Sequence, residues 1–241
     1  MIGSLRVALQ FLTKLPVRSE SPTALDIARS YYFYPIIGLL VGLVAILLRF
    51  VLAVFFPMPF CLMVVLAFLI WVTGGLHEDG LADVADGMAG GWTTEDRLRI
   101  MKDSHVGAFG ALALALMLLI KYSALTSMNP LHVDNAIVSG QLLARWAFLP
   151  FGYFNSPARE GLGSRFMKGI TKETVIITSV LAATIVILLS PLRGAIAFCV
   201  SGIVVAASCA YFRARLGGVT GDCFGATFQF VEIATYVVFL A

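Results

Sequence analysis

Seven long apolar stretches leave this chain few ways to fold. They cover residues 31–56, 58–73, 107–128, 136–152, 174–190, 194–212 and 227–241. Most come close to the roughly 17–25 residues that a membrane-spanning helix needs. They are continuously apolar, without the alternation of polar and apolar residues that marks the strands of outer-membrane barrels. We therefore expect an all-α, polytopic integral membrane protein with about seven transmembrane helices, within a range of about six to eight.

The composition agrees with a membrane location. Of the 241 residues, 59% are hydrophobic and only 13% are charged, whereas soluble domains carry about 25% charged residues. Residues 1–30 are too polar to supply the apolar core of a cleaved signal peptide, so we expect the first span to anchor the chain. The stretches 58–73 and 227–241 are short enough to be re-entrant or tilted segments. We expect a single membrane-embedded catalytic domain, residues 1–241, because no Pro/Ser-rich linker interrupts it.

Basic residues are unevenly distributed between the connections that alternate along the chain. One set of connections carries Arg6, Lys14, Arg18 and Arg29, then Arg97, Arg99 and Lys102, then Arg159, Arg165, Lys168 and Lys172, then Arg213 and Arg215. The opposite set holds little beyond Arg193. By the positive-inside rule, this asymmetry predicts a cytoplasmic N-terminus in a bacterial inner membrane. The motif-bearing loops 73–106 and 212–226 are then expected to face the cytoplasm as well.

The most unusual polar segment is HEDGLADVADG, residues 77–87. Asp79, Asp83 and Asp86 are spaced i, i+4 and i+7, so on a helix they share one face. Such like charges repel one another unless a cation neutralises them. Mg²⁺ takes one or two carboxylates together with substrate phosphates, and two ions would suit a displacement at phosphorus. The alternative is a solvated acidic loop, but the ordered spacing and the flanking glycines favour a metal site.

His77 stands beside these carboxylates, and its role has three interpretations. It is a metal ligand, a general base or only a hydrogen-bonding loop residue. The later stretch around Asp222 is rich in glycine, whose backbone N–H groups can line a phosphate. Asp222 would then join the metal site or orient a nucleoside hydroxyl, and the alternative is an interfacial turn with basic anchors.

Several separated motifs resemble those of one enzyme family. TGGLHEDGLADVADG, residues 73–87, resembles the signature of the cobalamin synthases, the adenosylcobinamide-GDP ribazoletransferases. Further similar motifs follow the family's order: FLTKLPV (11–17), YPIIGLLVG (34–42), MKDSHVGAFG (101–110), ARW (144–146), AREGLG (158–163) and RLGGVTGDCFGA (215–226). The motifs are spread along the chain, and the similarity extends over nearly all of it, so the resemblance is specific.

The resemblance implies a reaction and a cofactor. The enzyme joins adenosylcobinamide-GDP to α-ribazole, or to its 5′-phosphate, and gives adenosylcobalamin, or its 5′-phosphate, with release of GMP. The ribazole 3′-hydroxyl attacks the phosphorus that bears the cobinamide arm, and Mg²⁺ is the implied cofactor. One position departs from the family pattern, because His105 stands where an arginine is expected. Lys102 or Arg99 would then supply the positive charge.

The motifs and the chemistry together define a set of candidate residues. The catalytic candidates are His77, Asp83 and Asp86; the metal candidates are Glu78, Asp79, Asp83, Asp86 and Asp222; the substrate-binding candidates are Lys102, Asp103, His105, Arg145, Arg159, Arg215 and Thr220.

Three of the substrate candidates have alternative roles. Asp103 lies four residues after Arg99, so the two would pair if both were helical. Arg145 lies within an apolar stretch and needs an acidic or phosphate partner, for which Glu232 is one candidate. Arg159 belongs to a basic patch, with Arg165 and Lys168, that suits a pyrophosphate or anionic lipid headgroups.

Two other functions compete with the cobalamin synthase interpretation. A phosphatidyltransferase-like enzyme also uses aspartate-rich helix ends, but its pattern has an arginine soon after the first DG and a longer gap between aspartates. A cation or small-molecule transporter would place carboxylates within the spans, whereas here the acids cluster at span ends. As partners we expect the two substrates and membrane lipid, and no nucleic acid. Gly38 and Gly42 have GxxxG spacing, which permits close helix contact within the chain or at a dimer interface.

Overall fold

The computed structural model describes residues 2–17, 22–159 and 166–241, and within these ranges the chain is helical, with one isolated β-bridge between Pro157 and Val219. The helices are α1 (Ile2–Leu12), α2 (Ala24–Ser30), the 3₁₀ turn η1 (Tyr31–Phe33), α3 (Tyr34–Ala53), α4 (Met58–Thr73), α5 (Leu76–Gly90), α6 (Thr94–Ile100), α7 (Ala108–Ser127), α8 (Pro130–Tyr153), α10 (Lys172–Leu189), α11 (Pro191–Leu216) and α12 (Gly221–Leu240). The expected all-α architecture is confirmed.

Among the residues that the structure describes, five helical segments are long and apolar enough to cross a membrane. They are Ala24–Ala53, which joins α2 to α3, and α7, α10, α11 and α12; the bent pair α4 and α5 makes a sixth if it is one broken span. The predicted stretch 136–152 forms most of α8, which is long enough but carries buried polar groups such as Gln141 and Arg145. Neighbouring helices shield α8 from lipid, so it can carry polar side chains and have a lower hydropathy than the lipid-facing helices.

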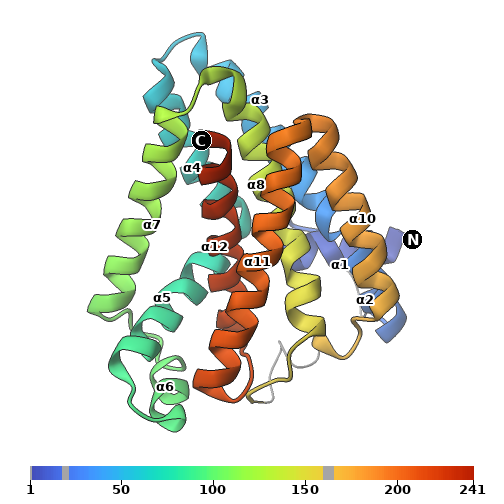
Figure 1. Ribbon diagram of the computed structural model, residues 1–241, viewed down its shortest axis with the longest axis vertical. Coiled ribbons are helices and arrows are strands. Elements are labelled where there is room, and N and C mark those ends of the chain that lie inside the picture. The colour runs from blue at the N-terminus through green and yellow to red at the C-terminus, as the bar shows by residue number, and fades with distance from the viewer. Residues whose placement is uncertain (1, 18–21, 160–165) are drawn as a thin grey trace.

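Helix α8 lies at the centre of the bundle, packed against α3, α10, α11 and α12 (Figure 1). The contact with α3 is made through the GxxxG pair. A Cβ atom on Gly38 would lie 2.5 Å from the carbonyl oxygen of Gln141, and one on Gly42 would lie 2.8 Å from the Cα of Val138. The two glycines therefore serve packing within the chain.

Two consecutive glycines separate α4 from α5. Gly74 and Gly75 have φ values of 72° and 73°, in the left-handed region that glycine adopts without steric cost. The chain turns there, and the two helix axes meet at 88°. The end of the N-terminal motif packs on this break, since the backbone N–H of Lys14 donates to the carbonyl of Val72 at 2.7 Å.

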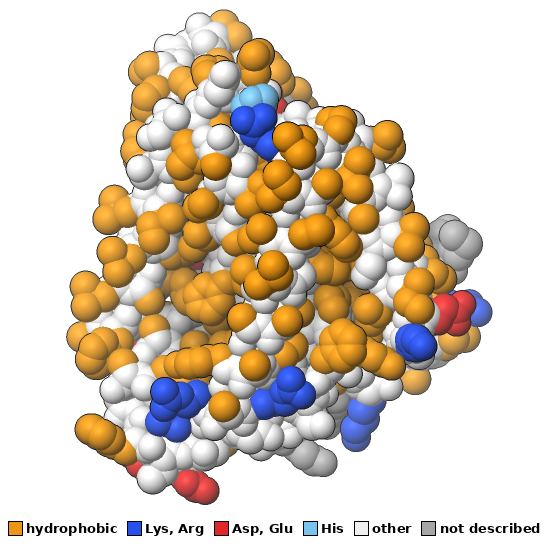
Figure 2. All heavy atoms as spheres, viewed as in Figure 1, with side chains coloured by type: hydrophobic (Ala, Val, Ile, Leu, Met, Phe, Trp, Pro, Cys, Tyr) orange, Lys and Arg blue, Asp and Glu red, His pale blue; other side chains and the backbone are white. Residues whose placement is uncertain are grey.

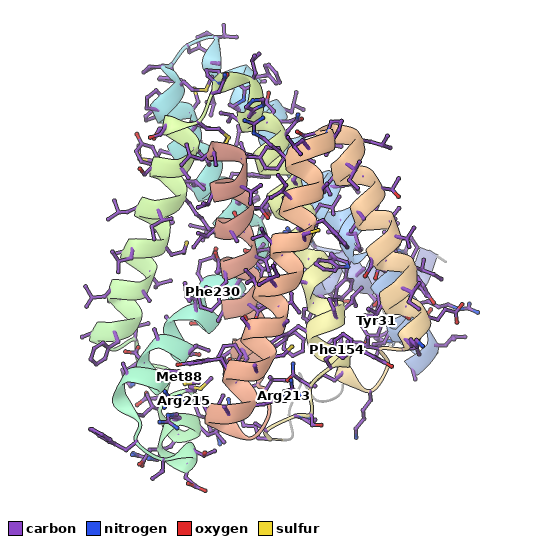
Figure 3. All side chains as sticks on the ribbon, in the orientation of Figure 1. Tyr31, Met88, Phe154, Arg213, Arg215 and Phe230 are labelled. Atoms are coloured by element: carbon purple, nitrogen blue, oxygen red, sulfur yellow. The ribbon has the colours of Figure 1, made fainter. Side chains whose placement is uncertain are left out.

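The connections lie at two opposite ends of the molecule. Those after α5, α8 and α11 are at the lower end of Figure 1, and those after α3, α7 and α10 are at the upper end. Figure 2 shows apolar side chains across the middle of this face and most of its basic side chains toward the lower edge. Arg213 and Arg215 are among the basic residues at the lower end (Figure 3). The acidic motif of α5 leads toward the same end.

Candidate active site

The acidic helix α5 and the C-terminal helix α12 touch at two glycines. A Cβ atom on Gly80 would lie 2.8 Å from the carbonyl oxygen of Asp222 and 3.2 Å from the Cα of Gly225. Only hydrogen atoms fit at this contact, so the two backbones approach as closely as helices can. The crossing brings Asp222, in the first turn of α12, next to the acidic face of α5.

Asp83 occupies the middle of the resulting carboxylate group. It is half-buried, and the charges of Asp79, Asp86 and Asp222 all act against its own negative charge. Arg159 supplies an opposing positive charge. The predicted shared face of Asp79 and Asp83 is therefore confirmed, and the structure adds Asp222 to it. We call Asp79, Asp83 and Asp222 the carboxylate group below.

Arg159 and Thr220 hold Asp222 in place. Nη2 of Arg159 lies 3.4 Å from Oδ2 of Asp222, and the hydroxyl of Thr220 donates to the same oxygen at 3.0 Å. Nη1 of Arg159 also donates to the carbonyl of Leu98 at 3.1 Å, which ties the site to α6. Two of the predicted substrate-binding residues thus contact a predicted metal ligand. Arg165 lies outside the described residues.

Asp86 lies on the same face but has a separate set of partners. Its two carboxylate oxygens accept hydrogen bonds from the backbone N–H groups of Gly107 and Gly110, at 2.7 and 2.9 Å. These N–H groups belong to the start of α7, where the helix leaves its first donors unpaired. Asp86 therefore caps α7 and attaches it to α5.

A cavity of about 300 Å³ opens beside the carboxylate group. Its polar lining includes His77, Asp79, Arg159, Thr220 and Asp222, and its apolar lining includes Phe11, Phe148, Phe166 and Phe224. The N-terminal motif, the acidic motif and the C-terminal motif each supply residues to it. The arrangement places carboxylates, one arginine and an apolar compartment in contact with the same volume.

Comparison with known proteins identifies the family to which this arrangement belongs. The family model described as cobalamin-5-phosphate synthase, CobS, matches residues 4–240. The chain belongs to this family. It is similar to adenosylcobinamide-GDP ribazoletransferases of Shewanella frigidimarina, at 34% identity over 98% of this chain and 93% of the relative, and of Shewanella woodyi, at 34% over 97% and 94%. The relative from Shewanella piezotolerans is 32% identical over 97% of this chain and 93% of its own. No solved structure matches the chain.

Family membership decides between the functions considered above. The chain is an enzyme of cobalamin biosynthesis and carries out the cobalamin synthase step. It is therefore neither a lipid phosphotransferase nor a transporter. The motifs at residues 11–17, 73–87 and 215–226 meet around the cavity, together with Arg159 of the motif AREGLG.

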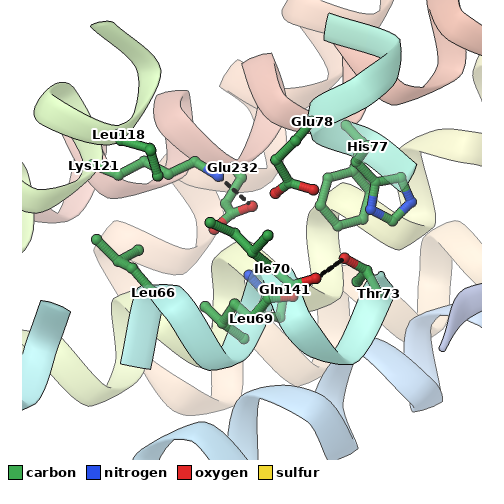
Figure 4. A pocket seen from close by; sticks show the side chains of 11 residues that line it. Leu66, Leu69, Ile70, Thr73, His77, Glu78, Leu118, Lys121, Gln141 and Glu232 are labelled. Carbon is green, nitrogen blue, oxygen red and sulfur yellow. Dashed lines mark hydrogen bonds and ion pairs between the residues drawn. The ribbon is translucent and has the colours of Figure 1, made fainter. Parts of the chain in front are cut away.

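His77 and Glu78 lie on another side of α5, toward the interior of the helical bundle. The ring of His77 is buried and stacks on Phe228, with centroids 3.7 Å apart. Glu78 accepts a hydrogen bond from Nε2 of Gln229 at 2.9 Å. Both side chains line a small buried pocket shown in Figure 4, and His77 also lines the 300 Å³ cavity.

The buried pocket contains an ionic network that joins α7 to α12. Nζ of Lys121 lies 2.9 Å from Oε2 of Glu232 (Figure 4). It also donates to the side-chain oxygen of Gln229. The hydroxyl of Tyr236 donates to Glu232 at 2.8 Å. Lys121 was not among the candidates, although a single lysine within the apolar stretch 107–128 signals a buried partner.

Arg145 is fully buried near this network. Its Nη1 donates to the side-chain oxygen of Gln141 at 2.8 Å, and its guanidinium lies 5.2 Å from the centre of the Phe228 ring. The ion pair of Glu232 is with Lys121 rather than Arg145. Arg145 is not among the described residues that line the 300 Å³ cavity, so the structure shows no contact between Arg145 and a substrate bound there.

The loop between α6 and α7 is exposed and carries Lys102, Asp103 and His105. Nδ1 of His105 lies 2.7 Å from Asp103, and the hydrogen bonds from the His105 side chain and backbone hold the pKa of the Asp103 carboxyl below its usual range. The alternative in which Asp103 pairs with Arg99 required both residues to be helical, and Asp103 is not. Helix α6 ends at Ile100, so Arg99 pairs with Asp96 instead, at 3.2 Å.

Arg215 is exposed at the end of α11, with its guanidinium 5.8 Å from the centre of the Tyr211 ring. Its backbone carbonyl accepts hydrogen bonds from Thr94 and Arg97 of α6, at 3.3 and 3.2 Å. The two hydrogen bonds to the carbonyl of Arg215 therefore attach α6 to α11. Gly217 follows it with φ of 69° and ends α11.

The donor chemistry of the carboxylate group fits Mg²⁺. In the described ranges no set of three or more His, Cys, Asp or Glu side chains is gathered tightly enough to form a complete metal cage. Mg²⁺ does not require one, because it usually keeps several waters and binds through one or two carboxylates plus substrate phosphates. The mutual repulsion around Asp83 is the feature that a cation would relieve.

Proposed function

We propose that the transfer takes place where α5 crosses α12, at the carboxylate group and its cavity. The observation that carries this proposal is the contact of Gly80 with Asp222 and Gly225, which gathers carboxylates from two distant motifs. The substrates are adenosylcobinamide-GDP and α-ribazole or its 5′-phosphate, in line with the name of the relatives, adenosylcobinamide-GDP ribazoletransferase. The products are adenosylcobalamin, or its 5′-phosphate, and GMP.

The reaction is a displacement at phosphorus. The 3′-hydroxyl of the ribazole attacks the phosphorus that bears the cobinamide arm, and the bond from that phosphorus to the oxygen of the departing GMP breaks. Transfers of this kind depend mainly on positioning and on neutralising charge at the phosphate oxygens. Arg159 is the cationic side chain among the described residues that line the cavity, and the geometry of its guanidinium suits a phosphate. The carboxylate of Asp79, which lines the cavity, would accept the proton of the attacking hydroxyl or orient it.

Mg²⁺ completes the proposed site. Asp79, Asp83 and Asp222 are the residues from which its one or two carboxylate ligands would come, and when bound it would neutralise the diphosphate charge and polarise the phosphorus. Asp86 and Glu78 contribute less directly in this proposal, because Asp86 caps α7 and Glu78 bonds to Gln229.

The proposed site faces the cytoplasm. Arg213 and Arg215, in the last turn of α11, lie at the lower end of the molecule, and Arg159 donates to Leu98 of α6 at the same end, as the positive-inside rule requires of the cytoplasmic side. Lipid would surround the apolar belt of exposed residues such as Leu47, Leu119 and Ile203. Labelling of a single cysteine introduced at Ser104 in right-side-out vesicles tests the orientation, and modification by an impermeant reagent from outside would contradict it.

The experiment that tests the proposal is GMP release from adenosylcobinamide-GDP by the purified protein in lipid. GMP should appear only when α-ribazole and Mg²⁺ are both present, and chelation should stop its release until Mg²⁺ is restored. Asp83→Asn should slow release at least about 100-fold, as losses of electrostatic stabilisation commonly do. Asp96→Asn is the matched control, because Asp96 pairs with Arg99 on α6. Full activity of Asp83→Asn, or full activity without divalent ions, would overturn the proposal.

A further inference from the structure

The apolar side of the 300 Å³ cavity is built from aromatic rings. Phe11 of α1 and Phe166 have ring centroids 4.1 Å apart, and Phe11 and Phe148 of α8 are 5.5 Å apart in an edge-to-face arrangement. Phe148 in turn lies 4.4 Å from Phe224 of α12. Four helical or near-helical segments thus supply one continuous aromatic lining. Such a lining suits a flat apolar ring, which it can hold by stacking and edge contacts.

The volume of the cavity limits which substrate part can enter. At about 300 Å³ it is at the small end of ligand pockets, which run from about 300 to 1,000 Å³. A nucleoside-sized group fits this space, whereas a corrin ring does not. The choice is therefore between two kinds of base in the reaction: the purines of adenosylcobinamide-GDP, which are its guanine and the adenine of its adenosyl group, and the dimethylbenzimidazole of α-ribazole.

The hydrogen-bonding groups on the edge of each base decide which one suits this lining, and they separate the purines from dimethylbenzimidazole. The edge of guanine carries a carbonyl, a ring N–H and an amino group, and each needs a hydrogen-bond partner if it is buried. Dimethylbenzimidazole carries methyl groups at the corresponding edge, and phenylalanine rings are good partners for them. Phe11, Phe148, Phe166 and Phe224 offer no side-chain hydrogen-bonding group, so this part of the cavity favours the benzimidazole.

We propose that the compartment lined by Phe11, Phe148, Phe166 and Phe224 binds the benzimidazole base of α-ribazole. The polar lining of the same cavity, with Asp79, Arg159 and Asp222, then receives the ribose and its 3′-hydroxyl. The direction in which the ribose points rests on the proposed function. Binding of the base in this compartment does not require the carboxylates. It also gives the N-terminal motif a role, since Phe11 is its first residue.

The test compares the two substrates in phenylalanine-to-leucine variants, which keep an apolar side chain but remove the ring. Phe11→Leu and Phe148→Leu should each raise the KM for α-ribazole several-fold, up to about tenfold for the loss of an aromatic partner. The KM for adenosylcobinamide-GDP and the kcat at saturation should stay within about twofold of wild type. Phe60→Leu, on the lipid-exposed part of α4, is the matched control and should change neither constant.

Equilibrium binding of labelled α-ribazole, without Mg²⁺ or the second substrate, separates this inference from the proposed function. Asp83→Asn should bind α-ribazole as wild type does, and Phe11→Leu should bind it several-fold more weakly. Free 5,6-dimethylbenzimidazole should displace the label, and guanosine should not. Unchanged binding in both phenylalanine variants, or displacement by guanosine but not by dimethylbenzimidazole, would overturn the inference. If these binding results hold while Asp83→Asn turns over normally, the proposed catalytic site fails and the base subsite stands.

Discussion

At the scale of single residues, the three aspartates of α5 have different surroundings. Asp79 is exposed at the cavity, Asp83 is half-buried among other carboxylates, and Asp86 is bonded to the backbone at the start of α7. Like charges around Asp83 cost stability, whereas the hydrogen bonds to Asp86 contribute it. The same residue type on one helix face therefore has opposite effects on folding.

This contrast predicts opposite effects of two substitutions on stability. Asp86→Ala removes the cap of α7 and should lower the free energy of unfolding by about 0.5–2 kcal/mol, the usual value of a capping side chain. Asp83→Asn removes a repelled charge and should leave stability equal or higher. Thermal unfolding in the same detergent measures both, without Mg²⁺. A larger loss in Asp83→Asn than in Asp86→Ala would contradict the assignment.

Much of this residue-level detail could not be predicted from the sequence. The helical period placed Asp79 and Asp83 on one face, and the structure confirms it. The period also placed Asp86 there, but its hydrogen bonds to Gly107 and Gly110 depend on where α7 packs. Lys121 and Glu232 are also far apart in the sequence, and only folding brings the two together.

At the scale of elements, two glycine contacts decide the position of the site. The break at Gly74 and Gly75 directs α5 away from α4, and Gly80 allows α5 to touch α12. Glycines in such a motif can serve a backbone turn, the close approach of a ligand or a helix contact. The structure confirms the turn for Gly74 and Gly75, whereas Gly80 serves helix contact. Sequence alone does not distinguish these uses, because the distinction depends on what lies opposite each glycine.

Gly80→Ala tests the helix crossing. The added methyl group would lie 2.8 Å from the carbonyl oxygen of Asp222, so α5 and α12 must separate. Overpacking of this kind costs about 1–3 kcal/mol, and a displacement of about 1 Å at a reacting centre can cost 100-fold in rate. We expect kcat to fall at least about tenfold in protein that is still folded.

The matched control for Gly80→Ala is Gly202→Ala on α11. A Cβ atom at Gly202 would meet no neighbouring atom within 4 Å, so this variant should be as active and as stable as wild type. Initial rates of GMP release and thermal unfolding measure the pair of variants. Wild-type kcat in Gly80→Ala would show that the close crossing is not required.

At the scale of the whole molecule, the apolar runs predicted a helical membrane bundle, and the polar interior was only partly foreseen. Glu232 and Arg145 were expected to need partners because charges are costly within an apolar span. The structure supplies Lys121 for Glu232 and Gln141 for Arg145. This buried network joins α7, α8 and α12 behind the active site, so it fixes how the site helices pack.

The network predicts a strong effect of removing one charge. Lys121→Met leaves Glu232 buried without its cation and should destabilise the protein by about 3–5 kcal/mol, as for other broken buried ion pairs. The double variant Lys121→Met, Glu232→Leu removes both charges and should recover much of that loss. Thermal unfolding in detergent measures the series. Equal stability of Lys121→Met and wild type would show that the ion pair is not needed.

The central claim is that Asp222 of α12 and the aspartates of α5 form one Mg²⁺-dependent site. The most direct test is the rate of GMP release by Asp222→Asn as a function of Mg²⁺ concentration. We predict that the variant needs at least about tenfold more Mg²⁺ for half-maximal rate and that its maximal rate falls at least about tenfold, because it loses a carboxylate ligand. An unchanged rate and an unchanged Mg²⁺ requirement would contradict the claim.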